Sequence, residues 1–359
     1  MPISLPVAAP GRVAARVLRS RWIRFNAGLA AAVWLVWFVA GGSFAWHSLV
    51  TNWRVALTMV FGSLVGGGTS EGGGAVAFPV FTKLLHIPAH QACLFAFAIQ
   101  SVGMGSASLS ILYLGIPIER RVLLWGGLGG IAGLVTSTYG IEPYLAPVLV
   151  RIAFTVMVST LGVALLLMNR KDMVMRHLRV PVFGATEKLL ILGAGFVGGM
   201  MSGLAGCGEN IAVFTVMVLL FRVSEKIATP TTVILMTMVT LAGFGLHVFA
   251  VHDFDRTVTS YWLAAAPIVA VGAPLGAILC SKMSRRTIVN VLLVLIGAEF
   301  TSTVLIIPMS RRVAIAATLS LVFFGMLNWV MSSIHAYAPR IAGDPVEMPG
   351  GGALEEKVS

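Results

Sequence analysis

Two glycine-rich strings combine small polar side chains with one carboxylate each. The first reads Gly66-Gly67-Gly68-Thr69-Ser70-Glu71-Gly72-Gly73-Gly74, and the second reads Gly203-Leu204-Ala205-Gly206-Cys207-Gly208-Glu209-Asn210. Glycine lets the chain turn sharply and lets a ligand approach backbone N–H groups. A helix that begins directly after such a turn points its positive end at the turn, which favours an anion. The strings therefore predict an anion site, with candidate residues Thr69, Ser70, Gly72, Gly73, Gly74, Gly206, Cys207, Gly208 and Asn210.

Glu71 and Glu209 are the carboxylates inside these strings. A carboxylate in a membrane segment is costly and by default indicates a function. Either side chain could carry a coupling proton or pair with a cation. Because a bare carboxylate repels an anion, we expect at least one of them to be protonated, paired or turned away. The structural alternative is a helix-capping role or a solvated turn.

Polar side chains also lie in the segment that follows each string. Gln100 and Ser101 follow the first string, and Thr229 and Thr231 follow the second. Their amide and hydroxyl groups could complete a cage around an oxyanion, and hydrogen bonding between helices is the equally good alternative. Two further polar residues in apolar segments suit structural roles: Glu299 should reach the membrane interface, and His247 should make a structural hydrogen bond.

Several enzyme classes lack their sequence patterns here. Neither string is a P-loop, since no Gly-Lys-Ser/Thr follows, and neither is a dinucleotide fingerprint, since no βαβ unit surrounds it. The three cysteines, Cys93, Cys207 and Cys280, stand singly in or beside apolar segments, which supports neither a disulfide framework nor a zinc site. We therefore expect no enzyme activity, no cofactor and no bound metal. Close helix packing is the simplest alternative explanation for the glycines.

The composition indicates a membrane protein. Of the 359 residues, 57% are hydrophobic and only 11% are charged, whereas soluble domains carry about 25% charged residues. The net charge of +11 does not indicate nucleic-acid binding, because the early basic residues, Arg12 to Arg24, directly precede an apolar run. That placement follows the positive-inside rule and suits anionic lipid head groups. We expect contact with membrane lipid and no nucleic-acid partner.

The polar residues lie in apolar segments of two kinds: ordinary spanning segments, and two longer segments that are broken by glycine. Ordinary spanning segments of about 20 apolar residues are expected at 27–46, 91–114, 122–140, 148–168, 229–251, 260–280, 287–307 and 312–334. The first is too long for a signal-peptide core and should be retained. Regions 54–86 and 189–222 contain the glycine strings. As an unbroken helix each would reach about 50 Å, too long for a hydrocarbon core of about 30 Å.

The two broken regions resemble each other. With a shift of 136 positions, Gly62 falls on Gly198, Gly67 on Gly203, Gly72 on Gly208, Phe78 on Phe214 and Ala92 on Ala228. Three apolar segments follow each region in the same order. Such a pattern is typical of transporter folds built from internal repeats.

Loop charges predict how the segments are oriented. The linker 169–188 is rich in Lys and Arg and residues 141–147 have neither, so the linker and the N-terminus should be cytoplasmic. Region 54–86 then begins and ends on the same face, as a re-entrant hairpin of two half-helices. Region 189–222 should enter from the other face, which inverts the second repeat. Arg311 and Arg312 fall outside and violate the rule.

The expected fold is all-α: an inverted repeat of a glycine-tipped re-entrant hairpin plus three transmembrane helices, with an extra transmembrane helix at each end. The divisions are a basic cytoplasmic arm at 1–26, the extra N-terminal helix and loop at 27–53, repeat 1 at 54–168, the cytoplasmic basic linker at 169–188, repeat 2 at 189–307, the extra C-terminal helix at 308–337 and a disordered tail at 338–359.

These features resemble the sulfite exporter TauE/SafE family of membrane permeases. Gly72-Gly73-Gly74, Pro79 and the small residues at 89–92 carry the resemblance, together with Gly203 to Gly208 and Ala228-Thr229, and it covers roughly 55–307. It implies gradient-driven transport of sulfite, sulfonates or related small organic anions across a bacterial inner membrane. The chain departs from the family pattern where Thr215 or its neighbours replace the second proline and where Glu71 and Glu209 occupy the tips.

Three functions stay open on the sequence alone. The first is a secondary transporter, expected to be an exporter, that moves small sulfur oxyanions or organosulfonates by alternating access around the two tips. The second is an anion channel, or a carboxylate transporter, with the same fold. The third is a membrane-embedded enzyme or a sensor. The expected partners are a small anionic substrate and membrane lipid, and a homodimer is possible.

Overall fold

The computed structural model describes residues 10–69, 72, 74–169, 176–334 and 346–347. Its α-helices are α1 Pro10–Thr51, α2 Trp53–Gly68, α3 Gly74–Pro79, α4 Ala89–Leu114, α5 Arg120–Gly140, α6 Pro147–Asn169, α7 Ala185–Ala205, α8 Glu209–Thr215, α9 Glu225–Leu246, α10 Arg256–Lys282, α11 Arg285–Ile306 and α12 Arg311–Ser333. The π-helical segments η1 Val80–Leu84, η3 Val216–Leu220 and η4 His247–Val251 extend α3, α8 and α9, and the short 3-10 helix η2 Glu142–Tyr144 follows α5.

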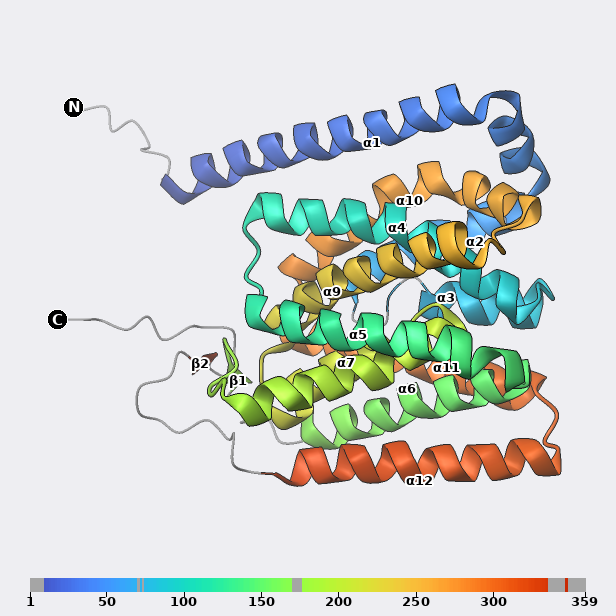
Figure 1. The fold of residues 1–359 in the computed structure, drawn as a ribbon. Helices are drawn as coiled ribbons and strands as arrows, with labels where there is room; N and C mark the ends of the chain where they lie inside the picture. The colour runs from blue at the N-terminus through green and yellow to red at the C-terminus, as the bar shows by residue number, and fades with distance from the viewer. Residues whose placement is uncertain (1–9, 70–71, 73, 170–175, 335–345, 348–359) are drawn as a thin grey trace, which may run out of the picture.

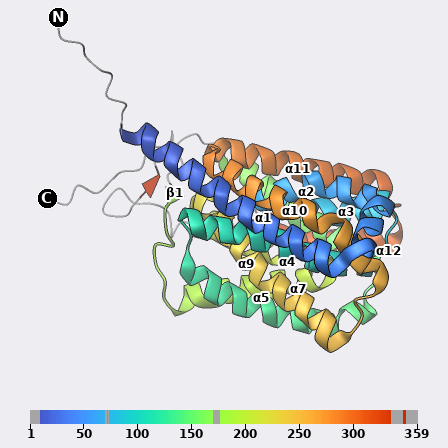
Figure 2. The ribbon, with the colours of Figure 1, turned by 90° about the horizontal axis from the view of Figure 1, so that it is seen from above.

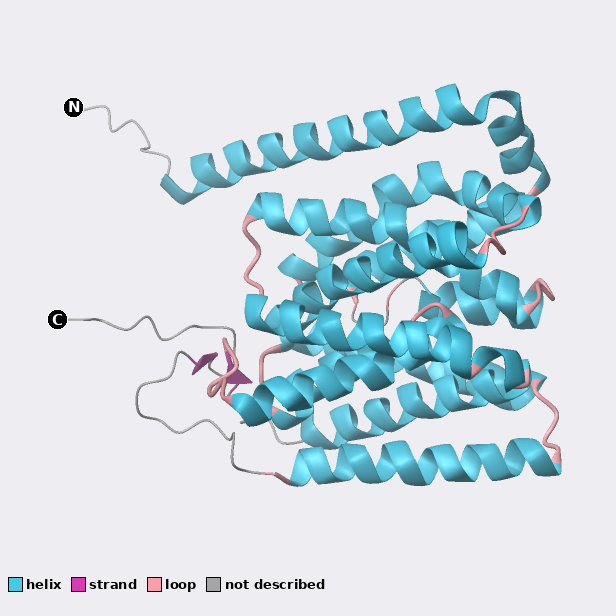
Figure 3. Ribbon diagram, viewed as in Figure 1, coloured by secondary structure: helices cyan, strands magenta, loops and turns pink. Residues whose placement is uncertain are grey.

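The described chain is almost entirely helical, which confirms the all-α class (Figure 3). Within the described residues, nine helices are long and apolar enough to cross a membrane. Eight of them contain or match, to within one residue, the spanning segments predicted from the apolar runs. The ninth is α7, the first part of the second broken region. The protein is therefore a multi-pass membrane protein.

The helices run roughly side by side, so that the bundle has two ends (Figure 1). One end carries the α4–α5 connection, residues 176–184 and the beginning of α9, together with Arg120, Arg121, Arg179 and Lys226. We call it the basic face. The opposite face carries residues 85–88, 141–146, 252–255 and 307–310. The start of α1 and the end of α12 lie at the basic face. Its assignment to the cytoplasm stays a prediction.

Helices α1 and α12 lie on the two outer edges of the bundle (Figure 1), and α1 crosses over α4 and α10 in the second view (Figure 2). The contact with α10 has a clear chemical cause. Pro267 inside α10 has no N–H, so the carbonyl four residues earlier, on Leu263, loses its helical donor. The indole of Trp37 donates to that carbonyl at 2.7 Å. The proline thus supplies the acceptor that fastens α1 to the bundle.

Each broken region consists of a long first helix, a turn, and a short helix that is continued by a π-helical segment. α2 ends at Gly68 and α3 begins at Gly74, while α7 ends at Ala205 and α8 begins at Glu209. The second short helix turns back along the first: a Cβ atom built on Gly198 of α7 would lie 2.8 Å from the Cβ of Ala212 in α8. Such a close approach is open only to glycine.

We call α3 with η1 the first short arm and α8 with η3 the second. Their ends have the same geometry, 136 positions apart. Leu85 N–H donates to Val80 O and Ile87 N–H to Phe81 O, and the second arm repeats both bonds as Phe221 to Val216 and Val223 to Met217. His86 and Arg222 both have a φ of 55°. Helices α4 and α9 then begin at the corresponding residues, Ala89 and Glu225. This recurrence fits the shift found in the sequence. The inverted orientation of the repeats stays a proposal.

Two segment ends differ from the expected divisions. Helix α7 begins at Ala185, inside the predicted linker 169–188, because Glu187 Oε2 accepts the N–H of Gly184 at 2.8 Å and caps the helix start. Within the predicted tail 338–359, Val346–Glu347 (β2) pairs antiparallel with Arg176–His177 (β1). The other tail residues, and residues 1–9 of the predicted basic arm, lie outside the described residues.

Candidate functional site

We call the two glycine-rich strings, 66–74 and 203–210, the glycine tips. Their described residues meet in the middle of the bundle. Gly72 has a φ of 75°. A Cβ atom built on it would lie 3.2 Å from Asn210 Nδ2 at the second tip and 2.4 Å from Met236 Cε in α9. The structure thus brings two predicted site residues, 138 positions apart, into contact. It also adds Met236, which gives no signal in the sequence because it is one methionine among many in an apolar run.

The second tip requires glycine at two positions. Gly206 and Gly208 have φ values of 76° and 144°, a region that side chains disfavour. A Cβ atom on Gly208 would lie 2.6 Å from the Cβ of Met201. Gln100 Nε2 of α4 donates to Gly206 O at 3.0 Å, so the tip is fastened to α4. This bond is of the structural kind that the sequence left open as the alternative, and the predicted role of Gln100 toward an oxyanion stays a prediction.

The first N–H groups of α8 are partly used by the protein itself. Glu209 N–H donates to Ser202 Oγ at 3.0 Å, and Gly208 N–H donates to Asn210 Oδ1 at 3.2 Å. These two N–H groups are therefore already used within the protein. Ser202, which closes the turn from seven residues away, was missed because a serine in an apolar run gives no signal of its own.

The carboxyl group of Glu209 is buried deep in the bundle. The residue is 1% exposed, and its Cγ lies 3.1 Å from a Cβ atom built on Gly130 of α5. Its Oε1 has no hydrogen-bond partner among the described residues. An ionised carboxylate without a partner is costly in such surroundings, so this oxygen is a place where a proton or a cation can be held.

The polar residues after each tip divide into two groups. Ser101 Oγ donates to Ala98 O, and Thr231 Oγ1 donates to Ile227 O while accepting the N–H of Glu119. Their hydroxyls thus serve helix structure. By contrast, Gln100 Oε1 and Thr229 Oγ1 are buried and have no partner within the described part of the chain. A buried polar atom without a partner is costly, and a bound ligand would remove that cost.

The remaining candidates lie at or near the tips. Thr69 is the C-cap residue of α2, is buried, and donates its N–H to Val65 O. Gly74 begins α3. Cys207 is 1% exposed, and its Sγ lies 3.9 Å from Ala205 O. Ser70, Glu71 and Gly73 lie outside the described residues, so their predicted roles stay predictions.

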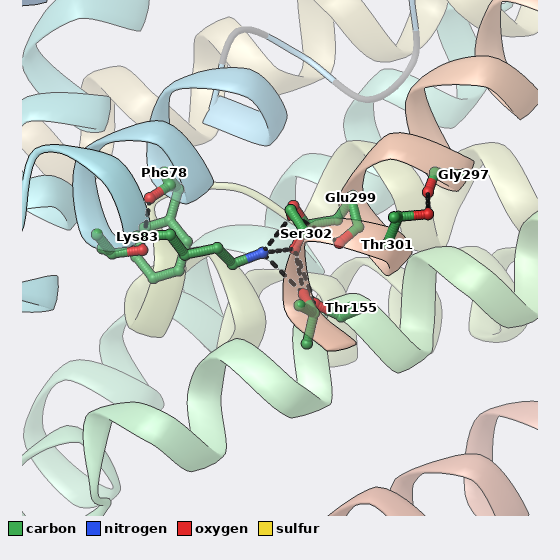
Figure 4. Close-up of polar contacts among 9 residues, drawn as sticks. Phe78, Lys83, Thr155, Gly297, Glu299, Thr301 and Ser302 are labelled. Atoms are coloured by element: carbon green, nitrogen blue, oxygen red, sulfur yellow. Dashed lines mark hydrogen bonds and ion pairs between the residues drawn. The ribbon is translucent and has the colours of Figure 1, made fainter. Parts of the chain in front are cut away.

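A buried ion pair fastens the first short arm to two helices of the bundle (Figure 4). Lys83 Nζ in η1 lies 2.9 Å from Glu299 Oε1 and 2.7 Å from Thr303 Oγ1, both on α11. Thr155 Oγ1 of α6 also donates to Glu299 Oε1, at 2.7 Å. The expectation that Glu299 reaches the membrane interface is therefore wrong: its side chain is 9% exposed because it neutralises Lys83. The available signal in the sequence was Lys83, a cationic residue in an apolar region that needs an acidic partner.

A second charged cluster joins three segments at the opposite face. His90 Nδ1, at the start of α4, lies 2.6 Å from Glu142 Oε1, and its Nε2 lies 3.1 Å from Asp253 Oδ2. His247 Nδ1 lies 3.1 Å from the other oxygen of Asp253. The expected structural hydrogen bond of His247 is thus present. No group of three or more His, Cys, Asp or Glu residues in the described chain could hold a metal ion.

Cavities approach the tips from both ends of the bundle. One of about 450 Å³ lies at the basic face and reaches Gly67 of α2 and Thr229 of α9. Another of about 470 Å³ lies at the opposite face, beside His90 and Glu142, and reaches Leu204 of the second tip. The tip region therefore lies between two hollows that face opposite ends.

Comparison with known proteins gives one match. The family model described as Sulfite exporter TauE/SafE matches residues 55–300. That range includes both tips, the buried ion pair and the helices that follow each tip, and it leaves out all of α1 and all of α12. No curated protein and no solved structure matches.

Proposed function

Because the chain belongs to the sulfite exporter TauE/SafE family, a family of membrane transporters, we propose that it is a secondary transporter of small sulfur oxyanions or organosulfonates such as sulfite. Its place would be the bacterial inner membrane, with the N-terminus in the cytoplasm, and its direction would be export. The observation that carries the proposal is the contact between the two tips, Gly72 against Asn210, in the middle of a membrane bundle.

The groups around that contact suit an oxyanion. Asn210 and Gln100 bring amides to the tips, and Gln100 already binds the backbone of the second tip. Backbone N–H groups at a glycine turn add donors without adding bulk. Non-helical backbone at membrane depth is tolerated where it lines a cavity. Ser70 and Gly73 would contribute from the first tip.

Alternating access would follow from two tips that belong to inverted repeats. The matching ends of the short arms and the hollows at the two faces support this arrangement. In transporters of this kind one repeat rocks against the other around a fixed central site. Glu209, and with it Glu71, would carry the coupling proton, because a buried carboxyl beside the site can exchange a proton when the bundle opens.

Two other functions would use the same fold. An anion channel would let its ion equilibrate without accumulation, and a carboxylate transporter would prefer a planar anion. The family favours a sulfur anion over both. No specific contact among the described residues favours a carboxylate.

A substrate screen on purified protein tests the proposal. Thermal-shift binding and uptake into proteoliposomes would be measured for sulfite, thiosulfate, sulfoacetate, taurine and a carboxylate control, with and without an imposed proton gradient. We expect a selective response to one sulfur anion and faster uptake with the gradient. A response to the carboxylate alone would contradict the proposed substrate class while leaving the transporter fold in place.

A further inference from the structure

The cavity at the basic face has a lining that suits an anion. Its walls come from Gly67 of α2, the α4–α5 connection at Gly115–Pro117, the first turns of α9, and Cys280 and Ser281 of α10. We call it the basic-face vestibule. At about 450 Å³ it is large enough for a sulfite-sized anion with several waters, each of which occupies about 30 Å³.

The described lining of the vestibule carries positive charge and no negative charge. Among the described residues that line it, Lys226 is the one cation and none is acidic. The adjacent Glu225 is fully buried and lies 3.5 Å from the guanidinium of Arg176, so that its charge is opposed. An ammonium group in the wall of a cavity attracts anions and repels cations. The opposite-face cavity differs, because Glu142 and Asp253 line it beside His90 and His247.

Thr229 supplies the second group. It follows Lys226 by three residues in α9, so that the two side chains lie on the same side of the helix, and both line the vestibule. Thr229 is 1% exposed, and its Oγ1 has no hydrogen-bond partner among the described residues. Threonine hydroxyls in helices usually donate to the preceding turn, as Thr231 does to Ile227 O. The hydroxyl of Thr229 is therefore left to bind a ligand.

We propose that Lys226 and Thr229 form an anion-docking site in the basic-face vestibule, from which the substrate passes to the glycine tips. This inference rests on the proposed function and narrows its substrate class. Lys226 selects the sign of the charge and Thr229 donates a hydrogen bond to an oxygen of the anion. The substrate is then a small anion without an ammonium group, so sulfite or a plain sulfonate is preferred over a zwitterion such as taurine.

Transport kinetics give the first test. Lys226→Met should raise the KM for the anion about tenfold, because a hydrogen bond to a charged group is lost, with the maximal rate little changed. Lys226→Arg should restore most of the affinity, and Thr229→Val should raise KM less. Lys188→Met is the control, because Lys188 lies at the same face over the ring of Trp125, outside the vestibule. An unchanged KM in Lys226→Met would contradict the proposal.

A labelling experiment tests the site without transport. Ser281 is an exposed lining residue, and Ser281→Cys would be reacted with anionic and cationic methanethiosulfonates of similar size. The parent chain, whose three cysteines are buried, gives the background rate. We expect the anionic reagent to be favoured, and Lys226→Met to lower the anionic-to-cationic rate ratio about tenfold. A ratio that Lys226→Met leaves unchanged would overturn the docking site. A lowered ratio in a protein that transports no sulfur anion would support the site and refute the proposed function.

Discussion

At the scale of single residues, the tip region is defined by atoms that lack partners. Gln100 Oε1, Glu209 Oε1 and Thr229 Oγ1 are buried without a hydrogen bond to any described residue, although each such atom costs free energy. Their neighbours Ser101, Thr231 and Ser202 are satisfied. We interpret the unsatisfied oxygens as groups kept for a substrate, a proton or water.

Glu209→Gln tests the coupling role. The amide keeps the shape of the side chain but cannot exchange a proton at neutral pH. We expect gradient-driven accumulation to fall to the equilibrium level while exchange of labelled for unlabelled anion continues. Glu187→Gln is the matched control, because Glu187 caps α7 and should not affect coupling. Normal accumulation by Glu209→Gln would remove Glu209 from the coupling mechanism.

Gly208→Ala tests the geometry of the second tip. The alanine would have to adopt a φ of 144° and would place its Cβ 2.6 Å from that of Met201. We expect transport to be lost and stability to fall by more than about 1 kcal/mol, as measured by thermal unfolding in detergent. Gly193→Ala, in α7 with nothing within 4 Å of the added Cβ, should behave like the parent chain. Full transport by Gly208→Ala would contradict a role for the tip.

The residue types at the tips were predictable, and their partners were not. Glycine strings with a carboxylate stand out in an apolar chain, so Gly206, Gly208 and Glu209 could be selected from the sequence. The contact of Gly72 with Asn210 and the bond from Gln100 to Gly206 depend on how distant segments pack. The use of Ser202 as a cap for α8 likewise depends on the turn that brings it back.

At the scale of elements, hydropathy predicted the long helices because lipid demands an apolar run of fixed length. It failed at helix ends that polar contacts set, as where Glu187 starts α7 at Ala185. It also gave no account of the pairing between Lys83 and Glu299, which are 216 positions apart and join η1 to α11. Such a pair needs the folded arrangement to become visible.

The Lys83–Glu299 pair should hold the first short arm in place. The side chains are 2% and 9% exposed, so Lys83→Met leaves an uncompensated buried carboxylate, which should cost about 3–5 kcal/mol. The double variant Lys83→Met with Glu299→Gln should regain much of that loss. Unfolding in detergent of the two single variants and the double variant would give the coupling. Additive losses in the double variant would show that the pair does not act as a unit.

At the scale of the whole molecule, the two faces differ in chemistry. Among the described residues, the basic-face vestibule is lined by Lys226 and by no acidic side chain, whereas the opposite-face cavity is lined by Glu142 and Asp253 as well as two histidines. The His90 bridges draw the start of α4, the α5–α6 connection and the α9–α10 connection together at that opposite face. An anion would therefore meet a more favourable potential at the basic face than at the opposite face.

Accumulation of labelled sulfite in proteoliposomes with an imposed proton gradient tests the central claim most directly. A coupled transporter should raise the internal concentration above the external one, and a protonophore should then release the excess. We predict accumulation that the protonophore abolishes. Uptake that stops at equal concentrations, with or without the protonophore, would contradict secondary transport and indicate a channel with two glycine tips as its filter.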